Sequence, residues 1–260
     1  MNVFEIGALI LGLLVGSFLN VCIYRLPRDL SIVSPGSACP SCGAPIRPWD
    51  NVPLLSYLVL RGKCRHCSVS ISPRYPFVEL LNGVLYWTVI AVFGPGWHAP
   101  FLFAFVSAMI VITFIDLDVQ LIPDRITLPG IFIGLGGASF LLPDPFSSSD
   151  RDIVGFVNSA IGFIAGGGLF FLIAVLSRGG MGGGDVKFMA MTGAWMGWKA
   201  VLLTTLIGSL AGSLIGIFLM VAKGKGRKTK IPFGPFLAMG ALVTLFAGGP
   251  IVDWYLGLYR

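Results

Sequence analysis

The sequence predicts an all-α polytopic membrane protein with about eight transmembrane helices, and its composition gives the first reasons. Hydrophobic residues make up 55% of the 260 residues, charged residues only 12%, and the mean hydropathy is +0.87. A soluble globular protein would carry about 25% charged residues. Glycine contributes 35 residues, and small residues allow helices to pack closely in lipid. These values exclude a soluble enzyme, a disordered chain and a secreted disulfide scaffold.

Apolar runs of helical length mark the expected spans, since about 20 residues cross a hydrocarbon core of about 30 Å. Glu5 stands where a cleavable signal peptide would carry basic residues, so we expect residues 1–24 to form a retained transmembrane helix. The sixth run is short, and its fusion with the seventh would give seven spans instead of eight. The runs cover residues 4–24, 77–94, 100–118, 126–142, 153–176, 186–199, 200–222 and 235–256.

The charged loops predict the orientation, because cytoplasmic loops carry an excess of Lys and Arg. Residues 25–76 hold seven such cations and residues 223–230 hold five, whereas the loop 143–152 has three aspartates and one arginine. With the N-terminus outside, eight spans place both basic regions in the cytoplasm and the acidic loop outside. The formal net charge of +6 reflects this topology, so we expect membrane lipid and no nucleic acid as a partner.

The polar block at residues 25–76 contains four of the five cysteines. They form two CxxC pairs, Cys39-Pro-Ser-Cys42 and Cys64-Arg-His-Cys67, separated by 21 residues. This spacing predicts a structural zinc site with four cysteine ligands in a small cytoplasmic domain inserted after the first helix. The alternative is two disulfides, which the reducing cytoplasm disfavours. We expect His66 to be a surface group and Cys22 to serve in packing.

The end of the third span carries three carboxylates in the stretch Phe114-Ile-Asp-Leu-Asp-Val-Gln-Leu-Ile-Pro-Asp124. Ionised groups near the hydrocarbon are costly and are usually functional. Asp116 and Asp118 point to different sides of a helix, and Asp116 lies deeper in the apolar run. Asp116 is therefore the candidate functional carboxylate. Asp124 follows Pro123, and a cap on the fourth span is its alternative role.

A glycine-rich stretch, residues 178–187, leads into the sixth span and contains Asp185, which opens that span. Its sequence lacks the GK[ST] of a phosphate-binding loop. A helix cap on a flexible loop is the structural alternative for Asp185. Lys187 could tune this carboxylate, contact a substrate or extend to the interface.

The topology places Asp116 and Asp185 at one cytoplasmic membrane face. Two aspartates that share a proton can hydrolyse a peptide, one as general base and the other as proton donor. His66 and His98 lie elsewhere, which argues against a histidine base. Two other classes remain open: a transporter that carries ions on these carboxylates, and an assembly protein that docks through its zinc domain.

The chain resembles the bifunctional prepilin peptidases, also called type IV leader peptidase/N-methyltransferases, of the GxGD aspartyl protease family. The two CxxC pairs and several other sequence blocks of the family occur here in the same order as in the family. Gly182-Gly-Gly-Asp185 fits the GxGD motif. The separation of Asp116 from Asp185 is slightly long, and the loop 143–152 could absorb the extra residues. The other matching blocks are Gly16–Pro27, Asp50–Tyr57, Ile71–Glu79, Phe114–Asp124 and Pro232–Gly240.

The resemblance implies that Asp116 and Asp185 are the catalytic dyad of a transmembrane aspartyl peptidase domain at residues 77–260. It implies cleavage of leaders from type IV prepilins or type II secretion pseudopilins at the cytoplasmic face of the bacterial inner membrane. It also implies N-methylation of the new N-terminal residue, usually Phe, by S-adenosylmethionine. The residues that bind this methyl donor stay unassigned, because no glycine-rich fingerprint follows a strand. A peptidase without methyltransferase activity is the nearest alternative.

Overall fold

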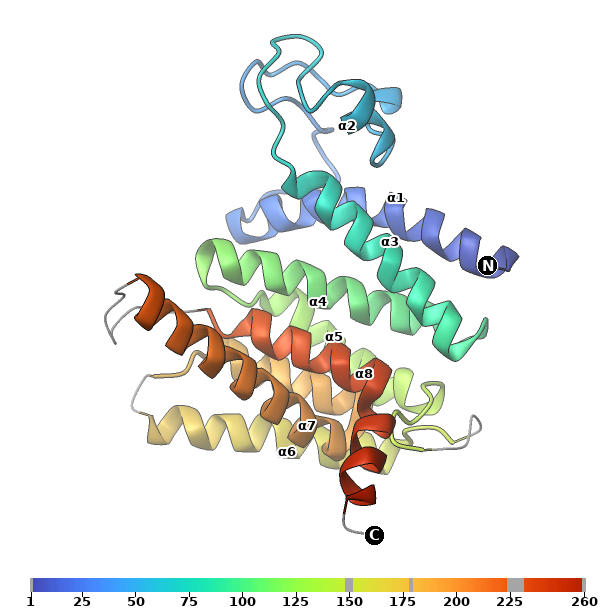
Figure 1. The fold of residues 1–260 in the computed structure, drawn as a ribbon, viewed down its shortest axis with the longest axis vertical. Coiled ribbons are helices and arrows are strands. Elements are labelled where there is room, and N and C mark those ends of the chain that lie inside the picture. Colours follow the sequence, from blue (N-terminus) through green and yellow to red (C-terminus); the bar gives the residue numbers. More distant parts are fainter. Residues whose placement is uncertain (1, 148–151, 178–179, 224–231, 259–260) are drawn as a thin grey trace. The chain divides into compact units, whose positions relative to one another are not determined.

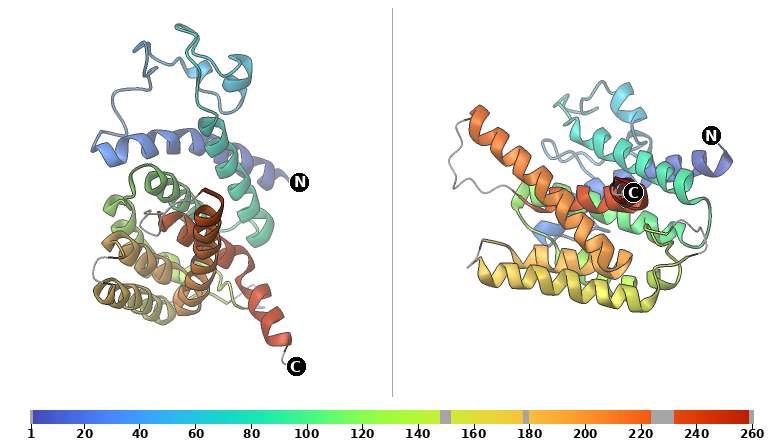
Figure 2. Two further views of the ribbon diagram at one scale, coloured as in Figure 1. Left: turned by 60° about the vertical axis from the view of Figure 1, so that its left-hand side comes forward. Right: turned by 60° about the horizontal axis from the view of Figure 1, so that its bottom comes forward.

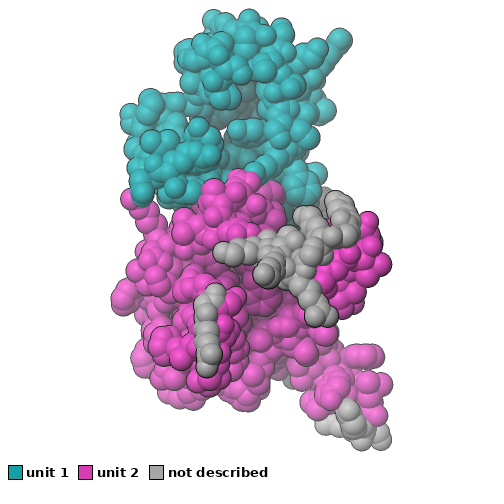
Figure 3. All heavy atoms as spheres, turned by 90° about the vertical axis from the view of Figure 1, so that its left-hand side faces the viewer, with its two compact units in different colours: residues 1–111 teal, residues 112–260 magenta. Residues whose placement is uncertain are grey.

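The computed structural model describes residues 2–147, 152–177, 180–223 and 232–258, and helices dominate these ranges. β pairing within them is limited to isolated bridges. The chain divides into two compact units, residues 1–111 and 112–260 (Figure 3). The helices are α1 (Val3–Arg25), α2 (Leu55–Val59), α3 (Arg74–Phe93), α4 (Ala99–Val119), α5 (Asp124–Gly136), α6 (Phe156–Leu176), α7 (Gly183–Lys223) and α8 (Gly234–Gly257) (Figure 1). Short 3-10 turns occupy Leu26–Arg28, Pro48–Asp50 and Ala138–Phe140.

The predicted fold class is confirmed, and the described residues include six helices that are long and apolar enough to cross a membrane: α1, α3, α4, α6, α7 and α8. The predicted run 126–142 differs from this pattern. It becomes α5, which has 13 residues and spans about 20 Å at 1.5 Å per residue. That length falls short of a hydrocarbon core of about 30 Å. The helix ends at Gly136 and Gly137, where two successive glycines disfavour its continuation.

The predicted sixth and seventh runs are the two arms of α7, residues 183–196 and 198–223. Gly197, between them, has φ 79° and ψ 179°, which is not a helical conformation. In a straight helix Gly193 and Val201 would be about 12 Å apart. A Cβ on Gly193 would instead lie 2.9 Å from Val201 Cγ2. The chain therefore reverses direction at Gly197, within the predicted boundary between the two runs.

In the first unit, α1 and α3 pack with little space between their backbones. Gly12 and Gly16 lie one turn apart on α1, and a Cβ on Gly16 would lie 2.7 Å from Glu79 Cα. Asn82 Nδ2 donates a hydrogen bond to Gly12 O at 2.7 Å. Small residues at this spacing are typical of helix pairs in membranes.

In the second unit, α6 lies against α7, as the two views in Figure 2 allow the reader to follow. A Cβ on Gly162 would collide with the carbonyl oxygen of Gly193 and would lie 2.6 Å from the carbonyl carbon of Gly197. A Cβ on Gly166 would likewise lie 2.8 Å from the carbonyl carbon of Met189 on α7. The glycines thus fix the approach of α6 to both arms of α7.

We expect Gly162→Ala to destabilise the protein by about 1–3 kcal/mol, because the added methyl group meets backbone atoms that cannot move aside. Gly168→Ala is the matched control, since a Cβ there has nothing within 4 Å. Thermal unfolding in detergent should show a lower midpoint for Gly162→Ala only. Equal midpoints for the two variants would contradict this packing.

Candidate metal centre and aspartate site

The four cysteines of the polar block come together in the first unit, as the spacing predicts. One Sγ atom from each of Cys39, Cys42, Cys64 and Cys67 lies within 4.8 Å of the other three. The Sγ atoms of Cys39 and Cys67 are 3.8 Å apart. A tetrahedron with metal–sulfur bonds of about 2.3 Å has sulfur–sulfur edges of about 3.8 Å. All four are free thiols rather than disulfides, so the donor set fits a tetrahedral metal ion.

Both CxxC segments adopt the same local structure. Cys39 N donates to Ala44 O, and Cys64 N donates to Val69 O, each at 2.9 Å. Isolated bridges pair Ala38 with Pro45 and Lys63 with Ser70, which is the same offset in each segment. Two similar turns therefore present two sulfur atoms each.

Neighbouring groups act differently on the individual thiols. The N–H groups of Cys42 and Ser41 lower the pKa of Cys39 to about 6, which favours the thiolate that binds metals. The N–H of Val69 lowers the pKa of Cys67, but desolvation and the other three cysteines outweigh it and raise that pKa to about 12. The four sulfurs therefore need a bound cation to ionise together.

An ion pair ties the second CxxC turn to the middle of the block. Arg65 Nε donates to Asp50 Oδ2 at 2.9 Å. The Arg65 guanidinium also holds the pKa of Asp50 below its usual value. The pair connects Arg65, inside the turn, to the 3-10 turn that ends at Asp50.

In the second unit, Asp116 lies near the end of α4 with 5% of its surface exposed. Asp118, two residues later, is exposed, as expected for positions on different sides of a helix. Asp116 Oδ2 accepts a hydrogen bond from Gly234 N at 2.9 Å. Gly234 is the first residue of α8, so this amide is one of those that a helix start leaves without an intrahelical partner.

Asp185 is half-buried in the first turn of α7. The carboxylates of Asp185 and Asp116 are close enough to interact electrostatically. Asp185 also accepts a hydrogen bond from the Gly182 backbone, so the capping role considered for it is compatible with its position.

Two contacts hold the Asp116 and Asp185 segments together. A Cβ on Gly184 would lie 2.9 Å from Ile122 Cβ, so the backbone before Asp185 touches the segment after Asp116. Lys187 Nζ donates to both Asp124 carboxylate oxygens at 2.7 Å. Asp124 begins α5 and uses its carboxylate to bind this lysine.

Residues 10–93 match the bacterial Peptidase A24 N-terminal domain, and residues 103–217 match the type IV leader peptidase family. The chain belongs to the type IV leader peptidase family. Proteins named prepilin leader peptidase/N-methyltransferase are similar over nearly the whole length. The one from Pseudomonas aeruginosa is 38% identical over 97% of this chain and 93% of its own, and the one from Stutzerimonas stutzeri is 39% identical over 99% and 95%. No solved structure matches the chain.

Sequence reasoning did not identify Gly234 as the hydrogen-bond partner of the candidate residue Asp116. The segment Pro232–Gly240 was noted only as a matching block. A glycine between Phe233 and Pro235, at the start of an apolar run, is the signal that could have identified a helix start with a free amide. Arg178 and most of the basic segment 223–230 lie outside the described residues.

We expect the purified protein to contain about one metal ion per chain, because four cysteines form one tetrahedral site. Cys64→Ser should lose most of this metal, whereas His66→Ala, a change between Cys64 and Cys67, should retain it. Elemental analysis by mass spectrometry measures the content. Equal metal loss in both variants would count against a site made of four cysteines.

Proposed function

We propose that this protein cleaves the leader peptides of type IV prepilins or type II secretion pseudopilins and N-methylates the newly exposed residue. The observation that carries the proposal is that the carboxylates of Asp116 and Asp185, 69 residues apart in sequence, lie within electrostatic range of each other in a chain of the leader peptidase family. Both proposed activities, leader cleavage and N-methylation, are those given in the names of the relatives.

Asp116 and Asp185 would act as one catalytic pair. Two carboxylates at short range do not both ionise readily, so they share a proton, and the apparent pKa values belong to the pair. The ionised aspartate removes a proton from the attacking water, while the protonated one donates a hydrogen bond to the peptide carbonyl. Gly234 N–H, bound to Asp116 Oδ2, would keep that carboxylate oriented during the reaction.

The pair would work at the cytoplasmic face of the bacterial inner membrane. By the positive-inside rule the cation-rich block before α3 would face the cytoplasm, and the two spans α3 and α4 that follow it would bring the chain back to that membrane face at the end of α4. The start of α8 binds Asp116 near the end of α4, and the start of α7 contacts Ile122 in the segment that follows α4. This meeting of three helix ends supports one common face for the reaction.

We assign zinc to the four-cysteine cluster, since tetrahedral thiolate sets select it. Its role would be structural, because the four sulfurs leave no position for a substrate. S-adenosylmethionine would supply the methyl group, as the relatives' N-methyltransferase names suggest. The bound zinc would keep the polar block of the first unit folded while the methyl group is transferred.

Replacement of either aspartate should abolish cleavage. Asp116→Asn and Asp185→Asn each remove a carboxylate of the pair, and we expect at least about a 100-fold loss of rate. Asp118→Asn is the control, because Asp118 lies on the same helix but is exposed. The measurement is mass spectrometry of a prepilin incubated with the protein in lipid and S-adenosylmethionine.

The same assay separates the remaining alternatives. A shortened and methylated product supports the full proposal, whereas a shortened, unmethylated product supports a peptidase alone. Near-normal cleavage by Asp185→Asn would show that Asp185 is a cap and not a catalyst. Absence of cleavage by wild-type protein with intact metal would favour the assembly protein.

Gly234→Ala should impair cleavage without preventing substrate binding. A Cβ there would lie 2.7 Å from Asp116 Oδ2, so the carboxylate must turn away and lose its amide donor. Hydrogen bonds to charged groups contribute about 1.5–3 kcal/mol, so we expect kcat to fall about 10- to 100-fold with KM little changed. Gly257→Ala is the control on the same helix, where a Cβ meets nothing within 4 Å. An unchanged kcat for Gly234→Ala would show that the amide does not support the pair.

A further inference from the structure

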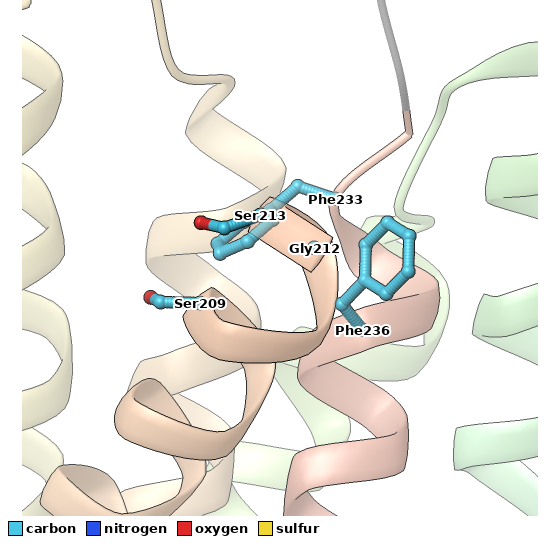
Figure 4. A pocket seen from close by; sticks show the side chains of 5 residues that line it. All are labelled: Ser209, Gly212, Ser213, Phe233 and Phe236. Carbon is cyan, nitrogen blue, oxygen red and sulfur yellow. The ribbon is translucent and has the colours of Figure 1, made fainter. Parts of the chain in front are cut away.

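A groove of about 270 Å³ lies between the second arm of α7 and the start of α8 (Figure 4). Among the described residues, the lining combines two hydroxyls with two aromatic rings and includes no charged side chain. The lining residues are Ser209, Gly212, Ser213, Phe233 and Phe236.

The space in the groove depends on Gly212. A Cβ at this position would lie 3.4 Å from Phe236 Cδ2 and 3.5 Å from Phe233 Cε2. A side chain larger than a methyl group would therefore extend into the space beside the two rings. Figure 4 shows the Phe233 side chain reaching toward Ser213.

The groove adjoins the aspartate site through the backbone of α8. Phe233 directly precedes Gly234, whose N–H binds Asp116 Oδ2 at 2.9 Å. Successive Cα atoms are about 3.8 Å apart. A peptide held with its cleaved bond at Asp116 can thus place a neighbouring side chain in the groove.

We propose that this groove binds a large apolar side chain of the substrate, the first one on the carboxyl side of the cleaved bond. The inference rests on the proposed function. The two aromatic rings of the described lining match an apolar side chain better than a charged one. Aromatic rings also favour another ring at contact distance.

The two serines suit the backbone of the same segment. Ser209 and Ser213 are four residues apart, hence on one face of the helix, and both are exposed. A peptide must leave its helical conformation to be hydrolysed, and its freed N–H and C=O groups are costly in a lipid environment. Serine hydroxyls can both donate and accept hydrogen bonds. The groove therefore satisfies backbone groups as well as an apolar side chain.

The test compares two prepilin substrates that carry Phe or Ala directly after the cleaved bond. We expect Gly212→Leu, which fills the groove, to lower the Phe-to-Ala ratio of kcat/KM at least about 10-fold. Phe236→Ala should also lower the ratio, because it removes one ring. Gly168→Leu is the matched control, made on α6 where a Cβ has nothing within 4 Å, and its ratio should equal that of wild type.

The outcomes separate this inference from the proposed function. Cleavage with an unchanged ratio in both groove variants overturns the subsite and leaves the peptidase intact. An equal loss on both substrates, with an unchanged ratio, indicates a structural effect or a bound lipid chain, and it also overturns the subsite. Failure of wild type and Gly168→Leu to cleave either substrate overturns both proposals.

Discussion

The hydrogen bond from Gly234 N–H to Asp116 Oδ2 is the interaction on which the aspartate site depends. A helix that starts inside an apolar region leaves amides without partners, and a buried carboxylate needs donors. The amide at the start of α8 gives the buried carboxylate near the end of α4 its donor, and the carboxylate gives that amide its acceptor. The positive end of the α8 dipole complements the same carboxylate. Because the bond joins residues 118 positions apart, it fixes the tertiary arrangement as well as one side chain.

Close glycine packing then determines where Asp185 can lie. The reversal at Gly197 brings both arms of α7 against α6, at distances that a Cβ on Gly162 or Gly193 would prevent. The first arm of α7 also packs against α5, and Trp195 Nε1 on this arm donates a hydrogen bond to Gly130 O on α5 at 2.7 Å. With this arm held on two sides, its first turn meets the segment that follows Asp116. The position of Asp185 is therefore a consequence of backbone packing along the whole arm.

The sequence predicted the features that depend on local pattern. Apolar runs located the long helices, and the CxxC spacing identified the cysteine cluster. The two-residue offset separated buried Asp116 from exposed Asp118. The features that it did not predict depend on contacts between distant segments, such as the Gly234 amide, the Lys187–Asp124 ion pair and the groove at Gly212. The short α5 was missed because hydropathy continues through Gly136 and Gly137 although the helix does not.

The two candidate sites consequently differ in how the chain assembles them. The cysteine cluster needs two similar turns and one ion, all within residues 39–67, and metal binding can itself drive such folding. The aspartate site needs the ends of three helices, brought together by packing that no single segment contains. Strain or loosening of the helices would separate Asp116 from Asp185 without breaking either turn of the cysteine cluster. Peptide cleavage is thus tied to the integrity of the helical bundle, whereas the polar block would depend on a metal bound by its four cysteines.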